Sequence, residues 1–222
     1  MTLIIAAHGK DFVVLGADSR ETVEPQYSPM QVQVNIAEKI VKLSRHSAVL
    51  ICGDMGQAQY LVEKFKAQRV DLDVDVSKVA EEFKGFCRDE AREVGNVPKY
   101  PNYFPDYRFI VAGLDKKRGA FKVPKSFSMG SVQGFRMNYG KEGFTLDGKP
   151  MLAYYQFEKY YLRAEKAEFD PLCVLVGQTL YDTRRIDADV GGQLRMALVR
   201  EKDGFGWIPD EDIVKKYTPD KW

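Results

Sequence analysis

Thr2 is the residue near the start of the chain whose type and position suit catalysis best. Aminopeptidases remove an initiating methionine when the next residue is small, so loss of Met1 would make Thr2 the N-terminal residue. Thr2 would then combine a hydroxyl nucleophile with a base, its own free α-amino group, whose reference pKa is about 7.7–8.0. Many proteins have a small residue after Met1, so Thr2 taken alone fits the ordinary start of a strand equally well.

Three further segments contain residues that suit the same chemistry. Asp18 and Arg20 lie where an expected second strand ends, and Lys39 lies at the head of a later strand. Gly53 separates an apolar strand from a helix, a place where backbone N–H groups can face a developing oxyanion. Each also has a plain structural explanation: Asp18 as a turn residue, Lys39 as a solvated charge and Gly53 as a helix-start turn.

Taken together and in this order, these segments resemble the proteasome β-subunit family of N-terminal nucleophile hydrolases, which includes the bacterial HslV peptidase. Lys39 and Gly53 lie 14 positions apart (53 minus 39), the spacing between the lysine and the oxyanion glycine of that family. Weaker likeness continues through 110–113, 153–161 and 187–192. The resemblance implies a single domain over residues 1–222, an α/β (α+β) protein built as a four-layer αββα sandwich.

The resemblance also implies a role for each matching residue. Thr2 would be the nucleophile, and Lys39, paired with Asp18, would lower the proton affinity of the active centre. The N–H group of Gly53 would stabilise the tetrahedral intermediate, and Asp187 would support Thr2 indirectly. The remaining implied positions are Arg20, which would buttress the site, Thr22, which would bind the substrate backbone, and Ala37, Ile51 and Met55, which would line the pocket for the residue before the cut.

The sequence departs from the family pattern where the family has supporting serines. Val190 stands three residues after the supporting aspartate, and residues 147–149 stand at the strand end before the third helix. An alignment on Gly130 and Ser131 keeps a serine but leaves an unexplained insertion, so we expect Ser131 in a hairpin connection. The uncharged pocket residues predict a preference for apolar side chains, although Glu21 beside the site would admit a basic one.

The elements that must position these residues follow from hydrophobic periodicity. We expect strands over 3–7, 12–17, 32–36, 40–43 and 48–52, with an irregular loop over 21–31. Helical spacing predicts two helices between Gly53 and Gly95, and a third over 153–164. Strands follow at 107–113 and 120–123, then hairpins with turns at 139–140 and 147–148. Residues 172–186 fit a helix or a buried strand, and a hairpin turns at Asp203 and Gly204.

Composition excludes several classes of function. The chain has 222 residues, 33 basic and 32 acidic, so its net charge of +1 gives no bulk attraction to nucleic acid or membrane. The basic run 116–118 is better explained as a solvated turn than as a nucleic-acid site. No apolar run reaches the roughly 18 residues of a membrane helix. We therefore expect a cytoplasmic protein without nucleic-acid or membrane partners.

Cysteine and histidine usage gives no metal or cofactor site. Cys52, Cys87 and Cys173 are odd in number and lie in apolar stretches, which predicts buried thiols in a reducing compartment. His8 and His46 are the two histidines, too few for a histidine-rich metal centre. We expect both to be partly exposed on the surface.

The first functional hypothesis is a threonine-type amide hydrolase that cuts peptides or unfolded proteins. Two alternatives stay open: a non-catalytic assembly subunit that retains Met1, and an acyl-transferase or amidase of the same type with another substrate. The resemblance further implies a homo-oligomeric ring or open spiral, with an ATP-dependent unfoldase as a partner. Aromatic residues on the helices, such as Phe83, Phe86, Tyr154 and Tyr161, suit either such contacts or the subunit's own core.

Overall fold

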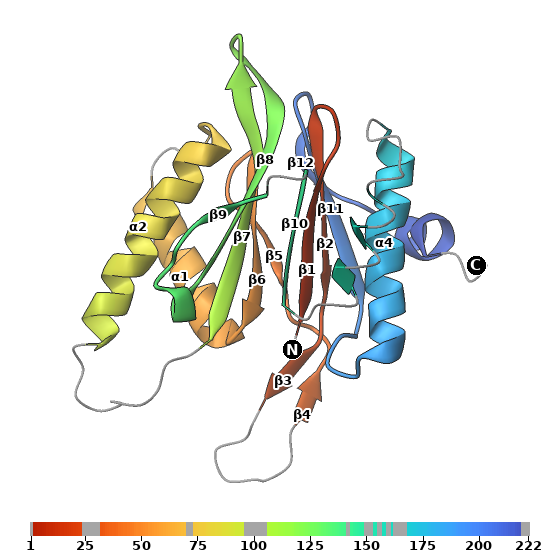
Figure 1. The fold of residues 1–222 in the computed structure, drawn as a ribbon, viewed down its shortest axis with the longest axis horizontal. Helices are drawn as coiled ribbons and strands as arrows, with labels where there is room; N and C mark the ends of the chain where they lie inside the picture. Colours follow the sequence, from red (N-terminus) through yellow and green to blue (C-terminus); the bar gives the residue numbers. More distant parts are fainter. Residues whose placement is uncertain are drawn as a thin grey trace.

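The computed structural model describes residues 2–23, 32–69, 73–95, 106–140, 143–148, 153–154, 157–158, 161 and 168–218; the side chains of 22–23, 32–34 and 94–95 are outside this description. Two antiparallel five-stranded sheets of these residues stack face to face (Figure 1). The first sheet has the strand order β10 (Phe144–Gly148), β1 (Leu3–His8), β2 (Phe12–Asp18), β11 (Leu194–Arg200) and β12 (Gly204–Trp207).

The second sheet has the order β5 (Ile40–Lys42), β6 (Ser47–Gly53), β7 (Tyr107–Lys117), β8 (Ala120–Gly130) and β9 (Asn138–Tyr139). A separate pair, β3 (Glu21–Val23) and β4 (Val32–Val34), extends below the end of the sandwich where β1 begins (Figure 1). The short 3₁₀ turn η1 (Ser131–Gln133) connects β8 to β9.

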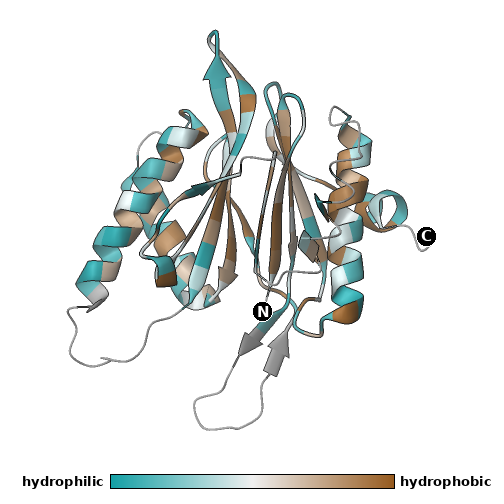
Figure 2. Cartoon of the chain, viewed as in Figure 1, coloured by the Kyte–Doolittle hydropathy of each residue, from teal (hydrophilic) through white to brown (hydrophobic). Residues whose placement is uncertain are grey.

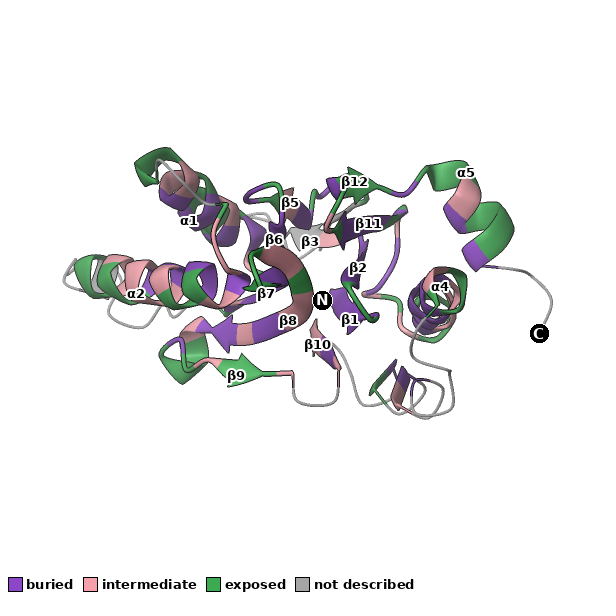
Figure 3. Ribbon diagram, turned by 90° about the horizontal axis from the view of Figure 1, so that it is seen from above, coloured by how far each residue is buried: buried purple, intermediate pink, exposed green. Residues whose placement is uncertain are grey.

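Helices cover the outer faces of both sheets (Figures 1 and 3). Helices α1 (Met55–Gln68) and α2 (Val76–Gly95) lie on the second sheet, and α4 (Phe169–Ile186) lies on the first. The short helical turns α5 (Asp210–Asp212) and η2 (Ile213–Tyr217) follow β12. The order helix, sheet, sheet, helix confirms the αββα sandwich that the sequence predicts.

The alternation of side chains along β1 shows how the sandwich is held together. Leu3 and Ile5 pack towards α4, whereas Ile4 and Ala6 join a cluster between the two sheets that also contains Leu50. Successive side chains of a strand point to opposite faces, so a strand buried on both faces is apolar throughout. Figure 2 shows this as hydrophobic colour along the central strands, with hydrophilic colour on the outer faces of the helices.

Several expected boundaries are wrong. Residues 21–23 form strand β3 instead of loop, and Ile36 lies outside β4 with 85% of its surface exposed. Asp147 and Gly148 end strand β10 and do not form a turn, because they pair with Ile4 and Leu3 of β1. Of the two alternatives for residues 172–186, the helix is confirmed, since these residues lie in α4. The expected third helix lies mostly outside the described residues, which are helical at 153–154, 157–158 and 161.

The expectation of surface histidines is also wrong, since His8 and His46 are 7% and 5% exposed. His8 Nε2 lies 2.8 Å from the Ser126 hydroxyl, and burial lowers the pKa of His8 to about 4. His46 Nδ1 lies 2.8 Å from a carboxylate oxygen of Asp73. Polar partners supplied by segments distant in sequence allow both rings to be buried.

The expected burial of the three cysteines and the expected turn at the basic run are confirmed. Cys52, Cys87 and Cys173 are buried free thiols. Residues 116–118 lie at the β7–β8 connection, where Arg118 and Gly119 have φ values of 53° and 84°, as a tight hairpin turn requires. Among the described residues, no helix is long and apolar enough to cross a membrane. In the same part of the chain, no group of three or more His, Cys, Asp or Glu side chains could hold a metal ion.

Two glycines give a matched test of how tightly α4 packs on the first sheet. A Cβ atom on Gly16 of β2 would lie 2.5 Å from Val176 Cγ1 and 2.9 Å from Leu180 Cδ1, whereas a Cβ atom on Gly85 of α2 would have no neighbour within 4 Å. Gly16→Ala should therefore destabilise the protein by about 1–3 kcal/mol. Gly85→Ala should stabilise it by about 1 kcal/mol. Denaturant unfolding of the two variants would measure both, and equal effects would contradict the packing.

Candidate active site

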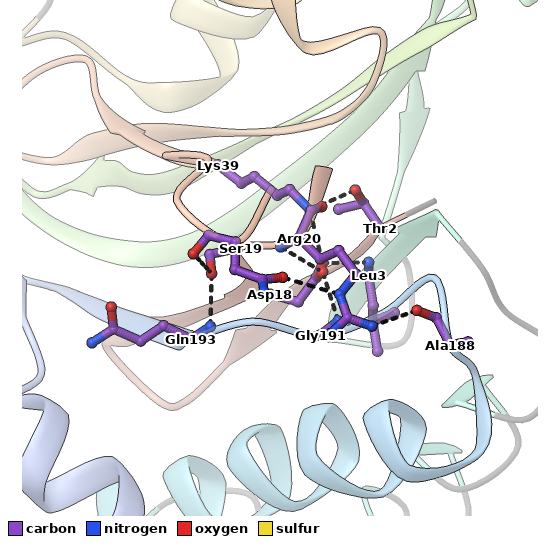
Figure 4. A network of polar contacts seen from close by, with 10 residues as sticks. Thr2, Leu3, Asp18, Ser19, Arg20, Lys39, Ala188, Gly191 and Gln193 are labelled. Carbon is purple, nitrogen blue, oxygen red and sulfur yellow. Dashed lines mark hydrogen bonds and ion pairs between the residues drawn. The ribbon is translucent and has the colours of Figure 1, made fainter. Parts of the chain in front are cut away.

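The most buried cation of the structure is Lys39, which contacts Thr2. Its side chain is 0% exposed, and its Nζ donates to Thr2 Oγ1 at 2.7 Å and to Asp18 Oδ1 at 3.1 Å (Figure 4). The same ammonium group donates to the carbonyl oxygen of Arg20. An ammonium group has three donors and no acceptor, so these three oxygens satisfy it completely.

Asp18 is the anion at the centre of this network. Its Oδ1 accepts from Lys39 and from the backbone N–H of Leu3 at 3.0 Å. Its Oδ2 accepts from the N–H groups of Arg20 at 3.1 Å and Gly191 at 3.0 Å. Backbone donors on both oxygens compensate for the loss of water around a side chain that is 0% exposed. The carboxylate therefore fixes the start of β1, the end of β2 and the loop after α4 around one point.

The electrostatics of the site follow from this burial. Burial lowers the pKa of Lys39 below its ordinary value, and the attraction of Asp18 opposes that shift without cancelling it. A positive charge at Lys39 also disfavours a second positive charge nearby. An amine at residue 2 would therefore remain neutral at a lower pH than a solvated amine, and a neutral amine can accept a proton.

Strand geometry explains why residues so far apart in sequence meet here. Thr2 precedes β1 and Asp18 ends β2, and because these strands are antiparallel the two residues lie at the same end of the first sheet. Lys39 precedes β5 in the second sheet, where its carbonyl oxygen accepts from the N–H of Ile51 at 2.9 Å. Its side chain crosses the space between the sheets to reach Thr2.

Ser19 and Arg20 join the surrounding segments to this centre. Ser19 Oγ donates to the carbonyl oxygen of Asn35 at 2.9 Å and accepts from the N–H of Gln193 at 2.7 Å. Arg20 Nη1 donates to the carbonyl oxygen of Ala188 at 2.5 Å (Figure 4). These bonds hold the segment before Lys39 and the loop after α4 against the end of β2.

Comparison with known proteins agrees with this arrangement. The "Proteasome subunit" family model matches residues 2–73, which contain Thr2, Asp18, Lys39 and Gly53. The chain is 24% identical over 216 residues to the proteasome subunit beta of Picrophilus torridus, covering 97% of this chain and 93% of the relative. It is 23% identical over 205 residues to the proteasome subunit beta of Thermoplasma acidophilum, covering 92% and 87%.

The family match and both relatives support a proteasome β-type chain of the N-terminal nucleophile hydrolases. The fold of this family is the αββα sandwich described above. In this proteasome-type chain, Thr2 is 4% exposed and lies between the two sheets, in contact with Lys39.

Gly53 has a backbone conformation that only glycine adopts easily. Its φ is 90°, a value that favours glycine, and a Cβ atom would overlap the carbonyl oxygen of Asp106. Asp54 follows and caps helix α1, since its Oδ1 accepts from the N–H of Gln57 at 3.1 Å. Gly53 thus ends β6 at the helix N-terminus, as the sequence predicts.

The other implied positions lie farther from the Lys39 contacts. Asp187 ends α4, and its Oδ1 accepts from the N–H of Asp189 at 2.9 Å, so it shapes the loop that reaches Asp18. Ala37, Ile51 and Met55 share one buried cluster between the second sheet and α1, at 9%, 0% and 3% exposure. Thr22 lies in β3, and its side chain is outside the described residues.

The positions of the family's serines are occupied differently here. Val190 is fully buried among apolar residues near α4. Ser131 begins η1, between β8 and β9, where its Oγ accepts from the N–H of Tyr107 at 3.1 Å, which confirms the expected connection.

Sequence reasoning missed Ser19 as the residue that links three segments, although it lies inside the motif that contains Asp18. It also missed Arg108, which reaches Asp147 across the sheets.

Proposed function

We propose that this chain is a threonine-type peptidase whose nucleophile is Thr2 after removal of Met1. The observation that carries the proposal is the 2.7 Å contact between Lys39 Nζ and Thr2 Oγ1, made by a fully buried ammonium group. Burying an ammonium group costs several kcal/mol before its partners compensate it. An apolar side chain would hold the sheets together at less cost, so this lysine supports catalysis over a purely structural role.

The reaction follows from the groups at the site. The free α-amine of Thr2 accepts the hydroxyl proton while Oγ1 attacks the carbonyl carbon of the scissile amide. The N–H of Gly53 stabilises the oxyanion of the tetrahedral intermediate. The protonated amine then gives its proton to the leaving nitrogen, which leaves an ester on Thr2. Water attacks the ester and passes a proton to the same amine, and the ammonium group returns that proton to Oγ1 as the acid product leaves.

Lys39 and Asp18 set the electrostatics of these steps. Lys39 donates to Oγ1, which stabilises negative charge as it develops on that oxygen during proton transfer. Asp18 holds Lys39 in position through Oδ1. We propose that Asp187 and Arg20 act indirectly, through the loop that supplies the N–H of Gly191 to Asp18.

The substrate proposal rests on the cluster between the second sheet and α1, which adjoins Lys39 through the bond from the N–H of Ile51 to the Lys39 carbonyl oxygen. Ala37, Ile51 and Met55 carry no charge, which favours an apolar side chain before the cut. Glu21 is the nearby acid that would instead favour a basic side chain, since it attracts the Lys39 ammonium. We also propose that Thr22 binds the substrate backbone and that peptides or unfolded proteins are the substrates.

We further propose that residues 1–222 form one domain that assembles into a homo-oligomeric ring or spiral in the cytoplasm, served by an ATP-dependent unfoldase. Support comes from the relatives, which are named proteasome subunits. The helix aromatics give less support than expected, because Phe83 and Tyr161 pack into the protein's own core at 0% and 2% exposure. Tyr154 is 45% exposed and remains a candidate contact.

The decisive experiment compares two preparations of the chain that differ only in Met1. One begins at Thr2, and the other retains Met1, as shown by intact mass. Fluorogenic peptides with Leu, Tyr, Arg or Glu before the cut serve as substrates for both. We expect turnover only from the chain that begins at Thr2, because only its α-amine can act as the base, with Leu and Tyr preferred.

Equal turnover by the two preparations would refute the proposal. Product analysis with an added amine nucleophile separates hydrolysis from acyl transfer, since hydrolysis gives the free acid whereas transfer gives a new amide. Absence of turnover from both preparations on every peptide would favour the non-catalytic assembly subunit. Preferred cleavage after Glu would contradict the pocket assignment alone.

A further inference from the structure

A second ion pair joins the two sheets close to Thr2. Arg108 of β7 donates through Nη1 to Asp147 Oδ1 of β10 at 3.1 Å. Asp106 holds the other side of the guanidinium, with Nε to Oδ1 at 3.1 Å and Nη2 to Oδ2 at 2.9 Å. Like the bond from Lys39 to Asp18, this contact runs from the second sheet to the first. The activity proposed above assigns it no role.

Strand register places Asp147 on the same side of the sheet as Thr2. Asp147 pairs with Ile4, whose side chain lies in the cluster between the sheets. Side chains two residues apart share a face, so Thr2, Ile4 and Asp147 all face the space between the sheets. Diagonal neighbours of this kind have Cα atoms about 7–8 Å apart. Gly148 lies so close to β1 that a Cβ atom on it would overlap the Thr2 carbonyl oxygen.

Cys52 shows how near the two ion pairs lie to each other. Cys52 of β6 is paired with Arg108 of β7, and Ile51 beside it bonds to the carbonyl oxygen of Lys39. Burial raises the pKa of the Cys52 thiol; Asp147, Arg108 and Lys39 also act on it through their charges. Both cations therefore lie near Cys52, at the end of the sandwich that contains Thr2.

Asp147 keeps a free acceptor towards the space between the sheets. In the described part of the chain, the bonds from Arg108 Nη1 and from the N–H of Gly148, at 3.1 and 2.7 Å, both end on Oδ1. Oδ2 therefore retains its acceptor capacity. The Asp147 side chain is 18% exposed, so water screens its charge only in part.

We propose that Asp147 is a positioning residue that raises the proton affinity of the Thr2 α-amine, and that Arg108 limits this effect. The proposal rests on the proposed function, in which that amine is the base. A carboxylate near an amine favours the ammonium form, so Asp147 acts against Lys39. Arg108 neutralises part of the Asp147 charge and itself disfavours the ammonium form.

Other charged or titratable groups lie on the elements around the same end of the sandwich and must stay constant in any test. They come from every element around it: Asp18 of β2, Arg20 and Glu21 at β3, Lys39 before β5, the Cys52 thiol of β6, Asp106 before β7 and Asp187 after α4. The effect of Arg108 and Asp147 is therefore measured as a difference in the pKa of the Thr2 amine between variants. These variants leave the other charged groups unchanged.

The test titrates the amine directly in a chain that begins at Thr2. The rate at which a small acylating reagent modifies the Thr2 amine, followed by peptide mass analysis across pH, gives the pKa of the amine without requiring peptidase activity. Asp147→Asn should lower this pKa by about one unit, and Arg108→Met should raise it by a similar amount. The double variant should lie near the unmodified protein, and Arg108→Lys should restore most of the wild-type value.

In the pH profile of kcat/KM, the acid limb should shift together with the pKa of the amine. It should move to lower pH in Asp147→Asn and to higher pH in Arg108→Met. The matched control is Glu201→Gln, which breaks the exposed ion pair with Lys122 and should move neither. An unchanged amine pKa in folded Asp147→Asn and Arg108→Met variants would overturn the proposal. If the amine pKa shifts as expected but no variant or wild type cleaves peptides, the inference stands and the proposed function fails.

Discussion

Thr2→Ala is expected to lower peptide hydrolysis by several orders of magnitude, to the level of the uncatalysed background. The substitution removes the attacking oxygen and leaves the α-amine, Lys39 and Gly53 in place. Because Thr2 Oγ1 makes one of the three bonds of the Lys39 ammonium, we expect the fold to persist with a small loss of stability. Active-site turnover with the best fluorogenic peptide would measure the effect, and thermal unfolding would report on the fold.

Thr2→Ser is the matched control for this prediction. It keeps a hydroxyl and an α-amine and loses only a methyl group, so it should retain part of the activity. Wild-type turnover by Thr2→Ala would exclude residue 2 as the nucleophile. Complete loss in both variants, with both folded, would mean that the methyl group has a larger part in orientation than the hydrogen bonds suggest.

Breaking the pair between Lys39 and Asp18 should give the largest loss of stability. Removal of one member of a buried pair typically costs about 3–5 kcal/mol, because the remaining charge is left buried. We expect Asp18→Asn to cost more than Lys39→Met, since Asp18 also accepts backbone N–H groups from Leu3, Arg20 and Gly191. Both variants should lose peptide hydrolysis. Denaturant unfolding would measure the free energies.

The double variant and an exposed pair provide the controls for that measurement. Asp18→Asn with Lys39→Met should cost less than the sum of the single changes, because no uncompensated charge remains. Arg195→Met breaks an ion pair with Asp210 whose side chains are both 45% exposed, and should cost well under about 1 kcal/mol. Additive single effects would contradict a buried, coupled pair.

The sequence predicted the layers of the fold because a buried strand or helix has a recognisable local pattern of apolar residues. Apart from His8 and Asp18 at their ends, β1 and β2 are apolar, and the periodicity of α1 and α2 is visible without any tertiary information. Strand ends were harder to predict. Asp147 and Gly148 have the composition of a turn, yet they extend β10 because β1 lies beside them as a partner. His8 was misplaced because the Ser126 hydroxyl that it contacts belongs to the other sheet.

Part of the candidate site could be predicted from the sequence, and part arises only from tertiary contacts. The residues near Thr2, Asp18, Lys39 and Gly53 form a motif with characteristic spacing, so the sequence identified them together. Arg108 and Asp147 lie 39 residues apart and meet only through the stacking of two sheets. The role of Gly191 as a donor to Asp18 is likewise a property of the folded chain, since 173 residues separate them.

That long separation has a consequence for timing during synthesis. A ribosome makes Thr2, Asp18 and Lys39 first, but the carboxylate of Asp18 receives its bond from Gly191 only after the last third of the chain has emerged. Gly191 follows Lys39 by 152 positions (191 minus 39), so at about 5–20 residues per second this interval lasts roughly eight to thirty seconds. During it, Asp18 lacks the donor that the loop after α4 supplies. On the proposed function, the surroundings of Thr2 are therefore complete only near the end of synthesis.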